Sequence, residues 1–199
     1  MERFEIHGLD NLCVSQDEIV WSKSNLLSWD DFQGIPKDDD ETRKHSLKAM
    51  SRTGLRFRID TKVIEKKTKK KFKIEKITVE ATFHKNGSWV KKDQIIPGKE
   101  STLLKHEQGH FDTAQLFVPN AQKMLELFVK NKTYTIKEKE GIRLEKIADD
   151  ESIKITNNKI DQIFEILKQN QRKYDEDTRH GVNQELQNKY NEIFDQLRN

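Results

Sequence analysis

The stretch LLKHEQGHFD, residues 103–112, places two histidines four positions apart, with a glutamate directly after the first. A helix advances about 100° per residue, so His106 and His110 lie about 40° apart and one turn above each other. Both can therefore direct neutral imidazole nitrogens, which are good zinc ligands, at one ion. Glu107 lies beside such an ion and can take a proton from a water whose pKa the metal lowers toward about 7. The spacing thus predicts a Zn²⁺ site at His106 and His110 with Glu107 as the general base of peptide hydrolysis.

A catalytic zinc usually takes three protein ligands and leaves one position open. On a continuous helix Asp112 lies about 240° from His106, so we expect it to point away and to cap or form a salt bridge behind the motif. His180 lies between two predicted helices, and Gly181 beside it permits a tight turn. We therefore expect His180 to be the third metal ligand.

Other residues remain alternatives for the third ligand or for its surroundings. An acidic residue of 174–178 is the main alternative, and Asp175 is otherwise expected in the shell around the ligands. Tyr174 or Tyr190 is expected nearby as a hydrogen-bond donor to a developing oxyanion. The remaining upstream histidines, each typical of an ordinary surface position, are His7, His45 and His84.

The motif must lie on a helix, and the flanking residues support one. Ser101 or Thr102 can cap a helix that runs to about Phe128, with a kink or break expected at Pro119. Glycine inside a helix costs about 1 kcal/mol relative to alanine. Gly109 is therefore best explained by the close approach of another segment or of substrate.

The residues before the motif predict an antiparallel hairpin. Apolar residues alternate with polar ones over 53–66 and again over 72–84, on either side of a lysine-rich turn. The alternation is interrupted between Ile74 and Ile77, which suggests a bulge. Residues 66–73 are expected to form an exposed hairpin tip without a part in the chemistry.

Helices are predicted to follow the motif. One helical face begins at Asn157, and a last helix follows Gly181 and starts with Val182. Residues 133–156 fit either a second hairpin that turns at Gly141 or a frayed helix. The fold class is therefore α+β, with an N-terminal antiparallel sheet, an active-site helix and C-terminal helices.

Composition narrows the classes of function. Charged residues make up 36% of the 199 residues and hydrophobic residues 33%, while the net charge is only +3. That charge does not indicate a nucleic-acid partner. A binder of anionic surfaces or nucleic acid stays a third hypothesis, carried by Lys66, Lys67, Lys69, Lys70, Lys71 and Lys73. The single cysteine, Cys13, excludes an intramolecular disulfide, and no stretch approaches the roughly 20 apolar residues of a membrane span.

Four segments resemble, in chain order, the motifs of the bacterial family called domain of unknown function 922: LSWDDFQGIP (27–36), GSWVKK (87–92), LLKHEQGHFD (103–112) and YDEDTRHGVNQE (174–185). Members of that family are described as secreted zinc-dependent proteases. The resemblance covers roughly residue 21 to the C-terminus and implies a zincin-like fold. It implies His106 and His110 as ligands and Glu107 as the acid and base, and it marks Asp112 and His180 as residues of the family pattern. Five further matches are expected to serve the core and turns: Trp29, Phe32, Gly34, Ser88 and Trp89.

Together these observations predict one zincin-like metalloprotease domain over residues 1–199, with residues 1–16 as an N-terminal extension and 131–156 as an insertion. The expected partner is a protein or peptide substrate, with no nucleic acid and no membrane span. The chain as given shows no signal peptide and is interpreted as cytoplasmic, whereas the resemblance implies a periplasmic or secreted protein. A metal-binding scaffold of the same fold without turnover is the alternative function. Nothing in the sequence specifies an oligomeric state.

Overall fold

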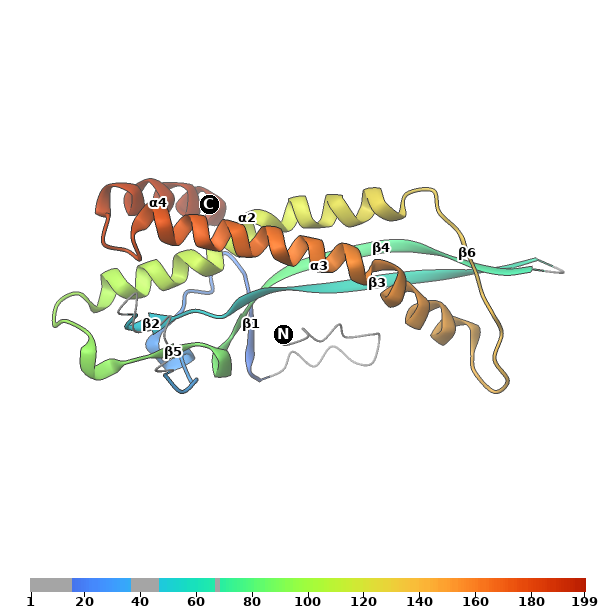
Figure 1. Ribbon diagram of the computed structural model, residues 1–199, viewed down its shortest axis with the longest axis horizontal. Helices are drawn as coiled ribbons and strands as arrows, with labels where there is room; N and C mark the ends of the chain where they lie inside the picture. Colours follow the sequence, from blue (N-terminus) through green and yellow to red (C-terminus); the bar gives the residue numbers. More distant parts are fainter. Residues whose placement is uncertain (1–15, 37–46, 67–68) are drawn as a thin grey trace. The chain divides into compact units, whose positions relative to one another are not determined.

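The computed structural model of the chain describes residues 16–36, 47–66 and 69–199. Over these residues the protein is a mixed α+β structure with antiparallel sheets and three α-helices (Figure 1). The helices are α2 (Glu100–Val129), α3 (Leu144–Thr178) and α4 (Gln184–Arg198). The strands are β1 (Glu18–Val20), β2 (Ala49–Met50), β3 (Thr53–Lys66), β4 (Lys69–His84), β5 (Trp89–Val90) and β6 (Tyr134–Thr135).

The chain divides into two compact units, and the long elements contribute to both. The first unit contains Arg56–Glu80 and Val118–Ile166. The second contains the described parts of Val14–Leu55, together with Ala81–Phe117 and Leu167–Asn199. Every predicted catalytic or metal-binding residue that the structure describes belongs to the second unit.

The larger sheet confirms the predicted alternation. Strand β4 lies between β1 and β3, and β1 pairs with it antiparallel so that Ile19 faces Phe83. Side chains two apart on β3 and β4 are buried because one face of the sheet is covered; they are Leu55, Phe57, Ile59, Ile77, Val79, Ala81 and Phe83. Two consecutive residues of β4, Glu75 and Lys76, are exposed at the place where the sequence pattern is interrupted.

The first unit corrects two expectations. Phe72, inside the predicted exposed tip, is fully buried against Ile136, Ile147 and Ala148, so residues 66–73 are not exposed throughout. Residues 133–156 form neither a second hairpin nor a frayed helix. Instead β6 pairs antiparallel with β4, and α3 begins at Leu144 because its first turns bury apolar side chains.

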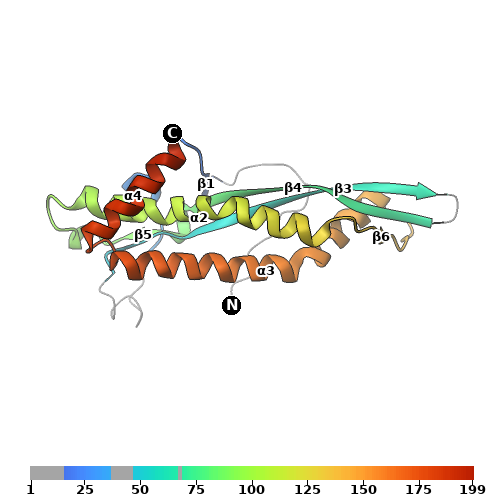
Figure 2. The same ribbon diagram turned by 90° about the horizontal axis from the view of Figure 1, so that it is seen from above.

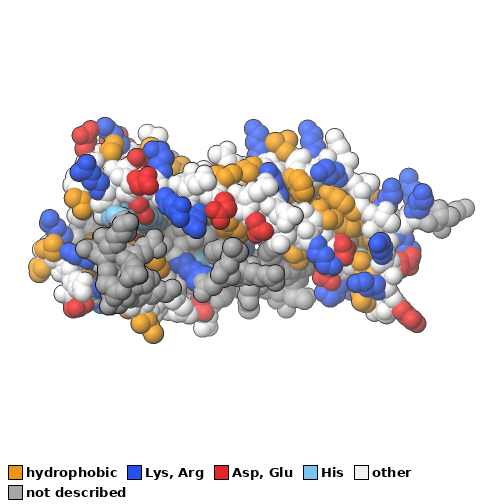
Figure 3. Space-filling view, viewed as in Figure 1, with side chains coloured by type: hydrophobic (Ala, Val, Ile, Leu, Met, Phe, Trp, Pro, Cys, Tyr) orange, Lys and Arg blue, Asp and Glu red, His pale blue; other side chains and the backbone are white. Residues whose placement is uncertain are grey.

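Other lysines of the 66–73 segment take part in ion pairs with neighbouring acids. Lys70 Nζ lies 2.8 Å from Glu138 Oε2, and Lys73 Nζ lies 3.1 Å from Glu75 Oε1. Figure 3 shows basic and acidic side chains interspersed over the visible face. Mixed charge of this kind is typical of a solvated surface.

In the second unit, the start of α2, the end of α3 and α4 pack together beside the short β2–β5 ladder. The first half of α2 and the last turns of α3 lie side by side in both views (Figures 1 and 2). The core between the helices includes Phe111, Tyr174 and Phe194, and the Tyr174 and Phe194 rings meet edge to face at 5.9 Å. The last helix begins at Gln184, capped by the Asn183 side chain, which accepts from the backbone N–H of Leu186.

The helices differ from the expected ones at two points. Helix α2 continues through Pro119, so of the expected kink or break there is no break in the helix. Val182 precedes α4 and is 76% exposed, so it is not part of the buried face of that helix. Within the described parts of the chain, no helix is both long enough and apolar enough to cross a membrane.

The candidate metal centre

Helix α2 presents the two motif histidines to the interior of the second unit. His106 is 3% exposed and His110 is half-buried, and their ring centroids lie 5.0 Å apart. The arrangement follows from the i, i+4 spacing because such residues share one face of a helix. The helix therefore brings the two rings together as the sequence predicted.

The C-terminal end of α3 brings Asp175 and His180 to the same place. Asp175 Oδ1 lies 3.2 Å from His106 Nε2, 3.1 Å from His110 Nε2 and 3.2 Å from His180 Nδ1. Ligand atoms of His106, Asp175 and His180 all lie within 4.8 Å of one another; His110 is not part of this mutual group, but its Nε2 contacts Asp175 Oδ1. The structure thus unites His180, the expected third ligand, with the acidic alternative from residues 174–178.

His180 is held by an unusual turn at the end of α3. Arg179, His180 and Gly181 have positive φ angles of 49°, 51° and 79°. A left-handed conformation costs an L-residue roughly 1–2 kcal/mol. The turn is closed by backbone bonds, from His180 N–H to Asp175 O at 3.0 Å and from Asn183 N–H to Thr178 O at 2.7 Å. Such strain in a fixed turn is typical of a residue positioned for function.

Glycine is required at position 181 for a second reason. A Cβ there would lie 3.1 Å from Cβ of His106 and 3.2 Å from its Cγ. The turn therefore passes directly over the His106 ring, and this close approach brings His180 to the motif.

Two glutamines orient the motif rings. His106 Nδ1 lies 3.1 Å from Gln187 Oε1 on α4, and His110 Nδ1 lies 2.7 Å from Gln171 Oε1 on α3. The amide group of Gln171 donates to the backbone O of His110 at 2.8 Å and to Thr53 Oγ1 at 3.1 Å. Its Oε1 is therefore left to accept from His110 Nδ1–H.

Gln187 orients the His106 ring in the same way. The amide group of Gln187 donates to the Tyr174 hydroxyl at 2.8 Å and to Asn191 Oδ1 at 3.1 Å. Its Oε1 accepts from His106 Nδ1–H. With a proton on each Nδ1, each Nε2 offers its lone pair to a metal once that nitrogen is deprotonated.

The Asp175 carboxylate is not a conventional hydrogen-bond acceptor in this cluster. Its Oδ1 atom is buried, and the described residues offer it no hydrogen bond of ordinary geometry, despite three ring nitrogens within 3.2 Å. The distances are short enough for hydrogen bonds, so the directions must be wrong. Asp175 Oδ1 nevertheless lies within 3.2 Å of all three nitrogens, and its interactions with the three histidines lower the pKa of the carboxylate.

The cluster strongly perturbs its ionisable groups. Burial lowers the pKa of His110, but its interactions with Asp175 outweigh burial and raise that pKa to about 9. Asp175 would have a raised pKa from burial alone, but the three histidines hold its pKa far below the ordinary value. Asp175 likewise raises the pKa of His180. Perturbed groups of this kind concentrate at functional sites.

Glu107 is 3% exposed and is fixed by Ser51 beside β2. The Ser51 hydroxyl donates to Glu107 Oε2 at 2.7 Å and lies 3.2 Å from the backbone O of Glu107. The charge of Glu107 contributes to the raised pKa values of His110 and His180. The carboxylate is therefore buried, fixed by Ser51, and electrostatically coupled to both rings.

Asp112 lies behind the motif, in the salt bridge that the helical geometry predicted. Its Oδ1 accepts from Trp21 Nε1 at 2.7 Å and from Gln108 Nε2 at 3.2 Å, and it also pairs with Arg198 near the C-terminus. The Arg198 guanidinium also donates to backbone oxygens of residues 22, 23 and 25. Asp112 thus ties the first strand, the motif helix and the last helix together.

The expected tyrosine donors point elsewhere. The Tyr174 hydroxyl is fully buried and donates to the backbone O of His106 at 3.1 Å, while the Tyr190 hydroxyl donates to Asp177 Oδ2 at 2.7 Å. Neither is directed at the space between the histidines, so the oxyanion role is wrong. Tyr174 instead stacks on the His106 ring with centroids 4.9 Å apart.

The expectation about Gly109 is confirmed. A Cβ at Gly109 would lie 2.0 Å from the Tyr174 hydroxyl oxygen and 2.6 Å from its Cζ. The segment that approaches the helix is therefore α3. Because Tyr174 fills the space, substrate does not approach the motif helix at this glycine.

The remaining candidates are not part of the cluster. His84 Nδ1 lies 3.2 Å from Glu18 Oε1, and burial lowers the pKa of His84. His7, His45 and Cys13 lie outside the described residues. The core and turn roles expected for Phe32, Ser88 and Trp89 are confirmed, since all three side chains are at least 94% buried.

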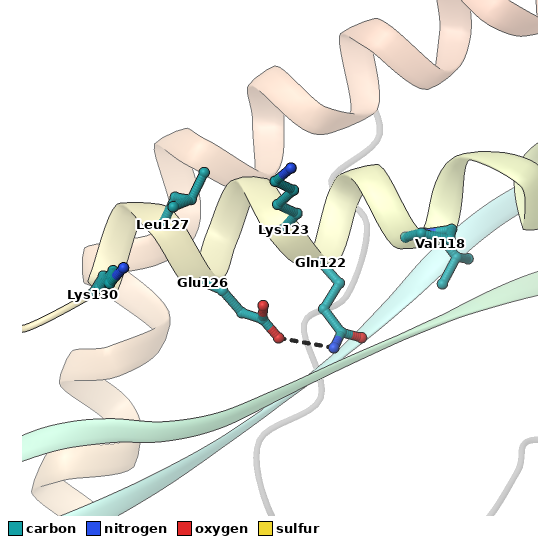
Figure 4. A pocket seen from close by; sticks show the side chains of 7 residues that line it. Val118, Gln122, Lys123, Glu126, Leu127 and Lys130 are labelled. Carbon is teal, nitrogen blue, oxygen red and sulfur yellow. Dashed lines mark hydrogen bonds between the residues drawn. The ribbon is translucent and has the colours of Figure 1, made fainter.

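A hollow in the first unit offers a contrast. It is lined by side chains of α2 alone, among them Val118, Lys123 and Leu127, and Gln122 donates to Glu126 across it at 2.9 Å (Figure 4). These residues include no histidine or cysteine, so the hollow has no counterpart to the donors of the cluster.

Comparison of the chain with protein-family models, with curated proteins and with solved structures found no match in any of the three. The resemblance to domain of unknown function 922 therefore stays a prediction, and any functional argument depends on the geometry of the cluster.

Proposed function

We propose that the protein is a zinc-dependent metallopeptidase with a zincin-like active site. The observation that carries this proposal is the convergence of His106, His110, His180 and Asp175 from two helices and one strained turn. Zinc suits this donor set because it accepts imidazole nitrogen and carboxylate oxygen at about 2.0–2.2 Å. The glutamines behind His106 and His110 supply the outer contacts that zinc-binding histidines normally have.

The chain supplies the base for hydrolysis. Bound zinc would lower the pKa of a water ligand toward about 7 and would polarise a carbonyl oxygen. In this proposal Glu107 accepts the proton of the attacking water and then passes it to the leaving amine. Ser51 limits the rotation of the Glu107 carboxylate by donating to Oε2, so the base is held ready. This proposal makes a protein or peptide the substrate.

Glu107 also distinguishes the proposal from its alternative, a zincin-fold scaffold without turnover. A structural metal site does not need a buried carboxylate that is fixed next to it. Glu107 accepts from Ser51, and it has no ion pair with a lysine or arginine among the described residues that would explain its burial otherwise.

The test measures metal content and hydrolysis on the same preparations. The wild-type protein is expected to hold about one zinc and to cleave an unstructured protein such as a denatured casein. Glu107→Gln keeps the shape of the side chain and removes the base, so it should keep the zinc and lose the cleavage. Zinc in both proteins with cleavage in neither would support the scaffold, and the absence of zinc from the wild type would reject both functions.

A further inference from the structure

A single carboxylate oxygen contacts all three histidines. Asp175 Oδ1 lies 3.1–3.2 Å from nitrogens of His106, His110 and His180. Two ligands that are each 2.0–2.1 Å from a tetrahedral ion lie about 3.3 Å from one another. Each of the three contacts of Asp175 therefore has about the length that separates two ligands of one zinc ion.

Hydrogen bonds alone do not account for this arrangement. Three N–H groups directed at one oxygen would satisfy it, but this buried oxygen has no hydrogen bond of ordinary geometry within the described chain. A second N–H on His106 and His110, whose Nδ1 atoms already face glutamine oxygens, would also place two imidazolium cations side by side. Neutral rings whose lone pairs converge with the carboxylate on one cation avoid this repulsion.

The position of Asp175 in the chain supports the same conclusion. It lies in the last turn of α3, directly after Tyr174, which is fully buried and stacked on His106. Its backbone O accepts from His180 N–H, which fixes the turn that carries the third histidine. The carboxylate is thus anchored to the motif helix and to the His180 turn together.

We infer that Asp175 is a fourth protein ligand, which occupies the coordination position that a hydrolytic water needs. A site with four protein ligands is closed, whereas a catalytic zinc keeps one position open. The resting centre is therefore closed, and each turnover requires the Asp175 carboxylate to leave the ion. This inference rests on the proposed zinc site and adds regulation to it.

Cobalt substitution tests the inference because Co²⁺ takes the place of zinc and its visible absorption reports the ligands and their number. The proteins compared are the wild type, Asp175→Ala and the control Glu176→Ala, which removes the adjacent exposed acid of the same helix. Each Co²⁺-loaded protein is titrated with azide, an anion that binds only at an open position. We expect no spectral change in the wild type or Glu176→Ala and a saturable change in Asp175→Ala, whose affinity for Co²⁺ should fall at least tenfold.

The outcomes separate the two proposals. A wild-type protein that binds one Co²⁺ and responds to azide like Asp175→Ala would overturn the closed centre and leave the zinc site standing. A wild-type protein that binds neither Co²⁺ nor Zn²⁺ would overturn the proposed function itself. If Asp175→Ala does not fold, a crystal structure of the zinc-loaded wild type decides: a carboxylate oxygen of Asp175 within about 2.2 Å of the ion supports the inference, and a water in its place contradicts it.

Discussion

Replacing Gly109 with alanine tests whether the packing of α3 on α2 assembles the centre. The new Cβ would lie 2.0 Å from the Tyr174 hydroxyl oxygen, 2.6 Å from Tyr174 Cζ and 3.0 Å from Phe194 Cε2. Ordinary carbon contacts are about 3.5–4.0 Å long. To restore contacts of this length, the Tyr174 ring must move by more than about 1 Å.

The change in the free energy of unfolding is the sum of opposing contributions. Alanine is favoured over glycine inside a helix by about 1 kcal/mol. Overpacking costs typically 1–3 kcal/mol, and disturbing the buried bonds of the Tyr174 hydroxyl to His106 O and to Gln187 costs about 1–3 kcal/mol more. Gly109→Ala should thus destabilise the protein by about 1–5 kcal/mol, which lowers the melting temperature by roughly 2–20 °C for a chain of this length.

The assay is thermal unfolding followed by circular dichroism, with a chelator present so that the metal does not contribute. Lys105→Ala on the exposed side of the same helix is the control, and it should change stability by no more than about 0.5 kcal/mol. The zinc content of Gly109→Ala should also fall, because Tyr174 precedes Asp175 on α3. A variant that melts at or above the wild-type temperature would refute the packing argument.

Three further predictions concern the cluster. Glu107→Gln should keep zinc while peptide cleavage falls by about 10²–10⁴-fold, measured by initial rates; an unchanged rate would give Glu107 another role. His180→Ala should weaken zinc binding by orders of magnitude in a competition titration with a chromophoric chelator, whereas Asp112→Ala should leave zinc affinity near normal and cost about 3–5 kcal/mol of stability by breaking a buried ion pair. In metal-free protein, the interactions of protonated His110 with Asp175 raise the pKa of His110 to about 9 and stabilise the fold by about 3 kcal/mol. This contribution is fully present below about pH 6.5 and is lost as the pH rises through 9. Denaturant unfolding at pH 6 and pH 10 should show that loss, and equal stability at both would contradict it.

The local part of the site could be predicted because helical periodicity is a local property. The i, i+4 spacing alone placed the rings of His106 and His110 together, and the 240° rotation alone turned Asp112 away. Gly109 likewise indicated a close neighbour because a helix interior disfavours glycine.

The residues that contact the two motif histidines could not be predicted in the same way, because tertiary packing determines which side chains reach the rings. Asp175 was predicted only as one of several acids that could be the alternative third ligand or lie around the ligands, since no spacing rule distinguishes it from the other acids before His180. Gln171 and Gln187 were missed as partners of the rings because glutamines on helices usually face solvent. Only their contacts across helices identify their role.

The start of α3 was also missed, although a signal was present. Leu144, Ile147, Ala148 and Ile155 recur at helical spacing and pack in one cluster with Phe72. The many charged residues between them obscured this face and favoured turns or frayed structure in the prediction.

The most direct test of the central claim is the zinc content of the purified wild-type protein and of His106→Ala. Both are expressed in zinc-supplemented medium, purified without chelators and measured by elemental analysis, with circular dichroism to verify folding. The account predicts about one zinc per chain in the wild type and almost none in His106→Ala. A folded wild type without zinc, or equal zinc in both proteins, would contradict it.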